Sequence, residues 1–442
     1  MALRVTAAAG EHDLLFLPWD IALEDWPEST IVALPRGISR HIVRFVRLTG
    51  DVYAVKETIE PIAQHEYDLL FELGRRGIPC VDPVGIVGGR TTPDGEELPA
   101  AIVTRHLQFS LPYRALFSTT LRPDTANRLI DALAVLIVRL HLAGFAWGDC
   151  SLSNTLFRRD AGAFAAYLVD AETGEIHDRL TDGQRYYDLE TAEINLGGEM
   201  LDVEASGRLH PSIDPIAMSQ QVRERYETLW HEISAPETIG YGERHRLDAR
   251  VRRLNDLGFD VAELSVVAQE GGSMIRVTPK VVDVGHHSRR LLRLTGLDVE
   301  ENQARRLLNN LDTYRVELGM RPEDEEVVAH RWVAEVFEPV TGLVPAELRG
   351  KLEPAQMFHE VLEHRWFMGE RLRRDVPLAE AARDYVASVL TTKPDEKSVL
   401  GQRLGTPSDM TGLRFEETAE LDLSELADLN EPGEPDESGA LG

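Results

Sequence analysis

The stretch from residue 148 to residue 172 constrains the fold more than any other part of the sequence. Asp149 and Asn154 are separated by four residues, and Asp170 follows after two apolar segments with a turn sequence between them. We predict strands over residues 155–157 and 165–170, joined by a turn at residues 160–162. Because the turn reverses the chain, Asn154 and Asp170 should lie at the same end of a hairpin, beside the loop that carries Asp149.

These three polar residues have the order and chemistry used for phosphoryl transfer in the kinase fold. A loop aspartate such as Asp149 accepts the proton of an attacking hydroxyl, so we expect it to be the catalytic base. Asn154 and Asp170 offer the hard oxygen ligands that Mg²⁺ prefers, and the metal would bridge the phosphates of ATP. An ordinary loop with capping residues explains each residue alone, but not the ordered set.

Lys56 is the second informative feature. The chain has 47 basic residues, of which only five are lysines, and Lys56 is the sole lysine in the first 279 residues. A predicted strand over residues 52–57 ends near it, and Glu66 follows on a predicted helix. A lysine that holds nucleotide phosphates and a helix glutamate that pairs with it are required in this order. Since a guanidinium does not replace a compact ammonium at such a site, we favour this role for Lys56 over a surface lysine.

The first 205 or so residues resemble the small-molecule branch of the protein-kinase-like fold, which includes bacterial lipopolysaccharide kinases, Rio kinases and aminoglycoside phosphotransferases. The resemblance is carried by Val55-Lys56, Glu66-Tyr-Asp-Leu-Leu70, His141-Leu-Ala-Gly144, Gly148-Asp149 through Asn154, and Val169-Asp170. The whole chain also resembles bacterial proteins in which such a domain precedes a domain of unknown function. The resemblance implies ATP and Mg²⁺ as cofactors, Asp149 as catalytic base, Asn154 and Asp170 as metal ligands, and Lys56 with its partner Glu66 at the phosphates.

The sequence departs from the usual kinase pattern at several points. The segment expected to cover the phosphates, residues 35–41, has one glycine instead of three, so we expect Ser39 or backbone amides to bind the nucleotide there. Trp147 and Gly148 stand where His and Arg usually precede the catalytic aspartate. Asp170 is followed by Ala and Glu172 rather than Phe and Gly, and we favour a solvated carboxylate over an extra metal ligand for Glu172.

The length of 442 residues predicts two or three domains. We predict an α+β fold: a bilobal protein-kinase-like domain, with an antiparallel sheet in the N-lobe and a helical C-lobe, and a second, mainly helical α+β domain. Helices are expected over residues 61–77 and 124–142, and a hairpin over residues 261–282. The predicted domains are residues 1–208, the domain of unknown function at 209–392, and an acidic disordered tail at 393–442.

Charge and composition exclude several classes of protein. The net charge of −28 argues against nucleic acid as a partner, and no apolar run is long enough to predict membrane insertion. Two cysteines are too few for a disulfide framework, and the first ten residues do not read as a secretory signal, so we expect a cytoplasmic protein. Residues 416–442 hold ten acidic residues and no basic one, which makes the tail the expected contact for a protein partner.

Three further groups of residues are weighed and given lesser roles. His359 and His364 are five residues apart, whereas a zinc-protease helix needs histidines four apart, so we predict a solvated helix there. The cationic residues between His286 and Arg306 fit either an anion-binding surface or a salt-bridged exposed face, and we favour the second. His141 is expected to support the catalytic loop through a hydrogen bond.

The function we predict is an ATP- and Mg²⁺-dependent phosphotransferase that acts on a hydroxyl of a sugar, a lipid-linked sugar or another small metabolite. The alternative is a catalytically weak, pseudokinase-like module that binds nucleotide and regulates a partner. Transfer of the nucleotide instead of the phosphoryl group would use the same pocket and stays open at this point.

Overall fold

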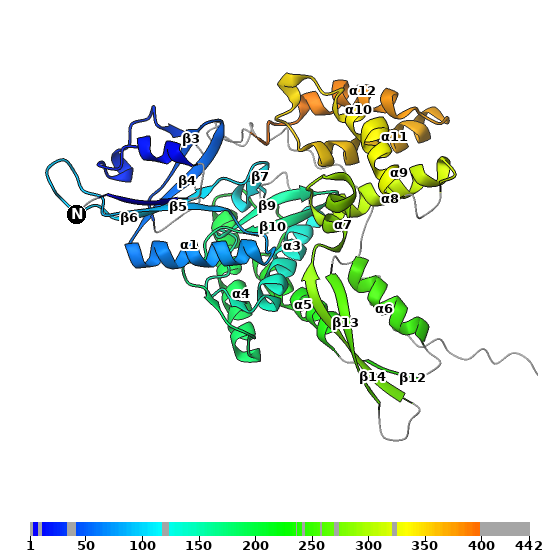
Figure 1. The fold of residues 1–442 in the computed structure, drawn as a ribbon, viewed down its shortest axis with the longest axis horizontal. Coiled ribbons are helices and arrows are strands. Elements are labelled where there is room, and N and C mark those ends of the chain that lie inside the picture. The colour runs from blue at the N-terminus through cyan, green and yellow to red at the C-terminus, as the bar shows by residue number, and fades with distance from the viewer. Residues whose placement is uncertain are drawn as a thin grey trace, which may run out of the picture.

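The computed structural model describes residues 3–7, 11–32, 41–116, 123–235, 237–240, 244–256, 259–268, 274–320 and 325–397. Four parts of the molecule follow one another along the chain: a sheet-rich lobe, a helical lobe, a three-stranded sheet with one helix, and a further helical region (Figure 1). The predicted α+β class, with an antiparallel N-lobe sheet and a helical C-lobe, is confirmed. Among the described residues, no helix is long and apolar enough to cross a membrane.

The N-lobe is built on a six-stranded antiparallel sheet in the order β1-β5-β6-β4-β3-β2. Its strands are β1 (Arg4–Ala7), β2 (Ile31–Val32), β3 (Val43–Leu48), β4 (Asp51–Thr58), β5 (Pro83–Gly88) and β6 (Ala100–Arg105). Helix α1 (Glu60–Arg75) covers one face, and the short 3-10 helices η1 (His12–Phe16) and η2 (Leu23–Asp25) belong to the apolar core of the other. β4 and α1 lie where the sequence predicts a strand over residues 52–57 and a helix over residues 61–77.

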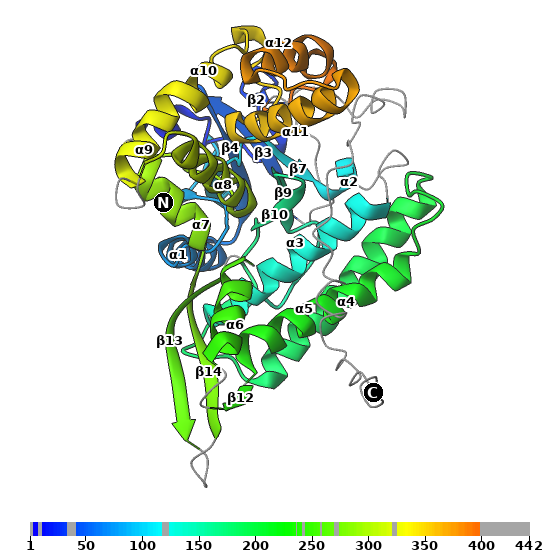
Figure 2. The same ribbon diagram turned by 90° about the vertical axis from the view of Figure 1, so that its right-hand side faces the viewer.

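The helical lobe is formed by long helices that lie side by side (Figure 2). They are α3 (Pro123–Leu142), α4 (Asp182–Ala205) and α5 (Pro215–Ser234), with the single-turn α2 (Tyr113–Leu116) before them. Between α3 and α4 the chain forms the short strands β8 (Phe145–Ala146), β9 (Thr155–Asp160), β10 (Ala163–Leu168) and β11 (Glu175–Ile176). β8 pairs with β11, and β9 and β10 form a three-stranded sheet with β7 (Ser110–Pro112), which precedes α2. The predicted β9–β10 hairpin is present, with its turn at Ala161 and Gly162.

A sheet of three strands follows the helical lobe. Its strands are β12 (Glu237–Gly240), β13 (Phe259–Ala268) and β14 (Met274–Val284), and α6 (Arg244–Asp256) packs against it. β13 and β14 form the predicted hairpin, although its connecting residues 269–273 lie outside the described part of the chain. The predicted boundary after residue 208 lies between α4 and α5, whose buried residues share one core; the division into domains stays a prediction.

The C-terminal helical region, residues 286–397, has an apolar core of its own. It contains α7 (His286–Thr295), α8 (Glu301–Glu317), α9 (Glu325–Trp332), a π-helical turn (Val333–Phe337), α10 (Glu338–Thr341), the 3-10 turn η5 (Ala346–Leu348), α11 (Pro354–Leu372), α12 (Leu378–Ser388) and the 3-10 turn η6 (Leu390–Thr392). Figures 1 and 2 both place α8 of this region beside the β9–β10 hairpin. The acidic residues 416–442 lie outside the described residues.

Candidate active site

Lys56 is directed toward α1 by the alternation of side chains along β4. Tyr53 and Val55 pack into the core on the opposite face of the sheet, so Lys56, one residue later, points to the face that α1 covers. Its ammonium lies 2.8 Å from Glu66 Oε2, which α1 presents, and only 11% of the side chain is exposed. The predicted partners on β4 and α1 are therefore in contact.

Two further carboxylates complete the surroundings of this ammonium. Lys56 Nζ donates to Asp170 Oδ2 at 2.9 Å and to Glu172 Oε2 at 3.1 Å. Ligand oxygens of Glu66, Asp170 and Glu172 lie within 4.8 Å of one another. When all are ionised, three carboxylates against one ammonium leave a charge of −2 in a largely buried space (−3 + 1). This excess negative charge and the oxygen donors are suited to a divalent cation.

The charges in this cluster shift each other's titration. Burial, reinforced by the Asp170 carboxylate, raises the pKa of Glu66 to about 7, although Lys56 acts in the opposite direction. Burial would by itself lower the pKa of Lys56, but Glu66 and Asp170 outweigh it, so the net pKa is raised. The ammonium thus keeps its charge, and Glu66 is the group in the cluster that takes up a proton near neutral pH.

Metal-free protein should therefore lose stability as the pH rises. The pKa of Glu66 rises from 4.5 to about 7 on folding, so the folded state binds the proton more tightly than the unfolded state. The resulting contribution to the free energy of unfolding is fully present below pH 4.5 and is lost as the pH rises to about 7. The full effect is about 3 kcal/mol of unfolding free energy. In EDTA, the midpoint temperature of thermal unfolding should fall less steeply between pH 4.5 and pH 8 for Glu66→Gln than for the wild type. Parallel curves would contradict the shifted pKa.

The loop between β8 and β9 holds Asp149 through its neighbours. The amide of Asn154 donates to Asp149 Oδ2 at 3.1 Å and to the Asp149 backbone carbonyl at 3.1 Å. From α4, Asn195 donates to Asp149 Oδ1 at 3.1 Å and to the carbonyl of Cys150 at 3.0 Å. One amide donor reaches each carboxylate oxygen, which fixes the plane of the carboxylate.

One face of α4 carries three polar residues that bind this loop. Asp188 accepts the backbone N–H groups of Trp147 and Gly148, both at 2.8 Å. Glu199 accepts the backbone N–H groups at residues 152 and 153, also at 2.8 Å. Asn195 lies between them, and spacings of seven and four residues put all three side chains on the same helix face. Hydrogen bonds to these three side chains thus hold residues 147–153 against α4.

His141 has the supporting role that the sequence predicts. Its Nε2 lies 3.1 Å from Asp188 Oδ2, its Nδ1 lies 2.8 Å from the hydroxyl of Tyr226, and it is 3% exposed. Burial lowers the pKa of His141, with Asp188 acting against the shift. The imidazole therefore connects α3 to α4 and α5 beneath the loop.

Comparison with known proteins finds two family models that each match a part of the chain. Residues 41–195 match the lipopolysaccharide kinase (Kdo/WaaP) family, and residues 228–390 match a domain of unknown function, DUF4032. The chain combines a kinase-like region with a domain of unknown function. Among solved structures it is similar to WaaP in complex with acyl carrier protein, with 16% identity, a TM-score of 0.35, and coverage of 57% of this chain and 99% of that chain. No curated protein matches the sequence.

Within the kinase-like region, the predicted site residues form two adjoining groups. In the first group, the carboxylates of Glu66 and Asp170 contact the ammonium of Lys56. In the second group, Asn154 contacts Asp149 in the loop. Asn154 and Asp170 begin and end the same hairpin: the N–H of Val169 donates to the carbonyl of Asn154 at 3.0 Å. Their roles as metal ligands stay predictions. Ser39 and most of the expected phosphate-covering segment lie outside the described residues.

The interpretation of Glu172 as a solvated carboxylate is wrong. Its side chain is 15% exposed, contacts Lys56, and lies 3.1 Å from His41 Nε2. Its own backbone N–H donates to Asp170 Oδ1 at 3.0 Å, which folds the residues after β10 back toward β4. Burial acts to raise the pKa of Glu172, but Lys56 outweighs it and the net pKa is lowered.

The histidines of α11 are also more buried than predicted. His359 is 3% exposed and lies 3.1 Å from Glu363, while His364 pairs with Asp384 of α12 at 2.7 Å, so the prediction of a solvated helix fails on this face. In the cationic segment after residue 286, His287 pairs with Glu301 and Arg290 with Glu325, which favours the salt-bridged face.

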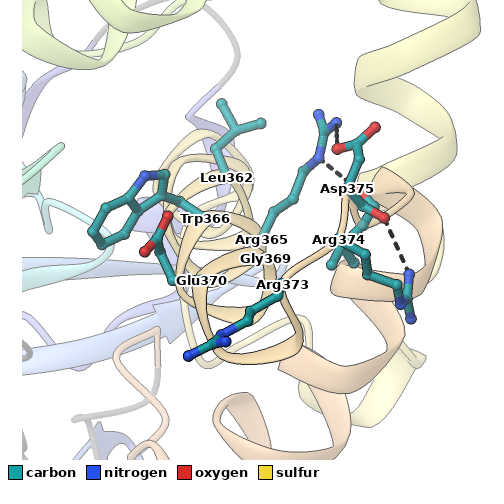
Figure 3. A pocket seen from close by; sticks show the side chains of 9 residues that line it. Leu362, Arg365, Trp366, Gly369, Glu370, Arg373, Arg374 and Asp375 are labelled. Atoms are coloured by element: carbon teal, nitrogen blue, oxygen red, sulfur yellow. Dashed lines mark hydrogen bonds and ion pairs between the residues drawn. The ribbon is translucent and has the colours of Figure 1, made fainter.

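A hollow of about 780 Å³ lies at the C-terminal end of α11, within the C-terminal helical region (Figure 3). Arg365 in its wall pairs with Asp375 at 3.0 Å, and Trp366 lies on the opposite side (Figure 3). A second arginine of the lining, Arg374, pairs with Glu380. The hollow shares no lining residue with the cluster around Lys56.

Proposed function

We propose that this protein is an ATP-dependent phosphotransferase that acts on a hydroxyl of a sugar, a lipid-linked sugar or another small metabolite. The observation that carries the proposal is the contact of Lys56 with Glu66 from α1 and with Asp170 at the end of the β9–β10 hairpin. The consecutive elements β4 and α1 meet there with the end of a hairpin more than 100 residues further along the chain, and this is the arrangement that phosphoryl transfer requires.

Asp149 is the proposed catalytic base. The amides of Asn154 and Asn195 hold its carboxylate, so an oxygen lone pair has a fixed direction toward an approaching substrate hydroxyl. As the hydroxyl oxygen bonds to the γ-phosphorus of ATP, its proton passes to Asp149 and the bond to the bridging oxygen breaks, leaving ADP. Lys56 binds the α- and β-phosphates and offsets their charge.

Magnesium is the proposed metal, held by Asp170 and Asn154, with Glu172 beside them. The fit rests on the carboxylate oxygens of Glu66, Asp170 and Glu172 gathered around Lys56, whose combined negative charge exceeds the positive charge of the one ammonium. When bound, the ion supplies charge neutralisation at the phosphates. Glu66 remains with Lys56 and keeps its ammonium in place.

The substrate class is supported by the match of residues 41–195 to the lipopolysaccharide kinase (Kdo/WaaP) family. A sugar hydroxyl, free or lipid-linked, is the acceptor that this similarity favours. The test is incubation of the full chain with ATP, Mg²⁺ and a sugar-rich metabolite extract, followed by ³¹P NMR of the products. ADP and a new phosphate monoester support the proposal. AMP or pyrophosphate would indicate nucleotidyl transfer, and nucleotide binding without turnover would support the pseudokinase-like alternative.

Replacement of Lys56 should show whether the site requires any cation at this position or specifically an ammonium. We expect both Lys56→Met and Lys56→Arg to lose at least about 100-fold in kcat/KM, because the bulkier guanidinium does not fit among three carboxylates at 2.8–3.1 Å. Arg47→Met, at an exposed position of β3, is the matched loss of a cation and should leave the rate unchanged. Full activity of Lys56→Arg would remove the lysine from the proposed mechanism.

A further inference from the structure

The β9–β10 hairpin is bound to the C-terminal helical region by hydrogen bonds and ion pairs. Four consecutive residues, 158 to 161, at the end of β9 and in its turn all bind side chains or backbone groups of that region. Three of the four are charged, and none is exposed to a large extent. Such a continuous run of buried polar contacts is directional and allows the two parts a single relative placement.

Asp160 acts as an N-terminal cap for a helix more than 140 residues away. Its Oδ1 accepts the N–H of Gln303 at 2.7 Å, and its Oδ2 accepts the backbone and side-chain N–H groups of Asn302 at 3.1 and 2.9 Å. These backbone groups belong to the first turn of α8, where N–H groups have no partner within the helix. Asp160 is 3% exposed and adds these acceptors to the capping box that Glu300 and Gln303 form on α8, so part of the capping of α8 depends on the hairpin.

Arg158 and Arg159 add ion pairs on either side of this cap. Arg158 lies 3.0 Å from Glu300 and 2.7 Å from Glu353, and all three side chains are less than one fifth exposed. Arg159 pairs with the buried Glu396 at 2.7 Å. Removing one member of such a buried pair leaves the other charge without compensation.

The turn itself is bound from the same side. Ala161 has a positive φ of 50°, a conformation that a residue with a Cβ adopts at a cost, and its N–H donates to Gln356 at 3.0 Å. On the strand that returns, the hydroxyl of Tyr167 donates to Glu300 at 2.6 Å. The contacts therefore fix both strands and the turn between them.

The other end of the same hairpin is the candidate active site. β9 and β10 pair continuously from Asp160–Ala163 to Thr155–Leu168, a ladder of about 17 Å. Asn154 immediately precedes this ladder, and Asp170 follows it by two residues. A short antiparallel ladder moves as a unit, so the orientation of its turn sets the orientation of Asn154 and Asp170.

We propose that the C-terminal helical region is a positioning element of the phosphotransfer site, acting through Arg158 and Asp160 on the hairpin that carries Asn154 and Asp170. The inference rests on the proposed function and deepens it, because it gives the domain of unknown function a role in that same site. Arg158 and Asp160 are positioning residues, since they touch the C-terminal helical region and not the reacting groups.

The test uses the full chain and metal binding as its readout. Mn²⁺ binding in the presence of a non-hydrolysable ATP analogue, measured by electron paramagnetic resonance, should weaken about tenfold or more in Arg158→Met and Asp160→Asn. Affinity for the analogue without metal should stay unchanged, which a loss of folding would not permit. Arg158→Lys should recover part of the metal affinity, because an ammonium keeps one carboxylate contact.

Arg290→Met is the matched control, since it breaks an ion pair with Glu325 inside the C-terminal helical region without touching the hairpin. It should leave metal affinity unchanged. Folded Arg158→Met protein with unchanged Mn²⁺ affinity would overturn the proposal.

Hydrogen exchange separates this inference from the proposed function. In Arg158→Met, amides of residues 168–170, at the far end of the hairpin, should exchange faster together with those at 158–163. If the wild type binds no nucleotide and no Mn²⁺, the proposed function fails, but faster exchange at 168–170 would still support positioning of the hairpin. Faster exchange confined to residues 158–163 would overturn the positioning role whatever the nucleotide result.

Discussion

Asp149→Asn is expected to reduce the rate of phosphoryl transfer by roughly 100- to 10,000-fold, the range that removal of a general base produces. Asparagine has the same shape but does not accept the hydroxyl proton. It retains one oxygen, so only one of the two amides that bind the carboxylate, from Asn154 and Asn195, keeps its acceptor. Steady-state release of ADP in the presence of the identified substrate measures the effect on kcat.

Binding of nucleotide should survive this substitution, because the cluster around Lys56 is unaltered. We expect the dissociation constant for the ATP analogue to change less than about threefold, within roughly 0.7 kcal/mol. The matched control is Asp178→Asn, an equal change of an exposed carboxylate beyond β11, which should retain the wild-type rate. A rate for Asp149→Asn within tenfold of the wild type would argue for a nucleophile activated without Asp149.

Much of the fold and part of the site follow from local patterns in the sequence. Alternation of apolar residues locates β3 and β4, and the order Asp149, Asn154, Asp170 predicts a hairpin whose two ends meet. Lys56 is recognisable because lysine is rare in a chain that otherwise uses arginine. These signals are local or compositional, so they need no knowledge of tertiary contacts.

The residues that hold the loop could not be predicted in the same way. Asp188, Asn195 and Glu199 appear in the sequence as ordinary polar residues of a long helix, and such residues usually face solvent. Their spacing of seven and four residues was the available signal, since it places them on one face, next to the face of the buried Leu189 and Leu196. The role of a polar helix face next to a buried apolar face can be predicted only when the position of the loop that packs on it is known.

Long-range contacts also decide which residues cap a helix. The spacing of Asp298 and Glu301 suggests a capping box, yet the residues that form it on α8 are Glu300 and Gln303. Glu301 instead accepts the N–H groups of His287 and Ser288 at the start of α7. Competition between two helix starts for nearby acidic side chains is decided by packing and not by sequence spacing.

Asp188→Ala should have the largest effect on stability among the residues of the site. Asp188 is 1% exposed and accepts two backbone N–H groups, from Trp147 and Gly148, besides its contact with His141. Alanine leaves these buried donors without an acceptor, which costs about 3–5 kcal/mol. The loop that carries Asp149 would then open more often, by a factor of roughly 100 to 4,000.

Hydrogen exchange of the Trp147 and Gly148 amides measures this opening directly, and it should accelerate by that factor at constant pH. Glu190→Ala, an exposed carboxylate two residues along the same helix, is the control and should leave these amides unchanged. Loss of Asp188 should also weaken phosphotransfer, since Asp149 follows Gly148 directly in the loop. If the two amides stay protected in Asp188→Ala, Asn195 and Glu199 alone hold the loop. The attachment of the loop to α4 would then not depend on the buried aspartate.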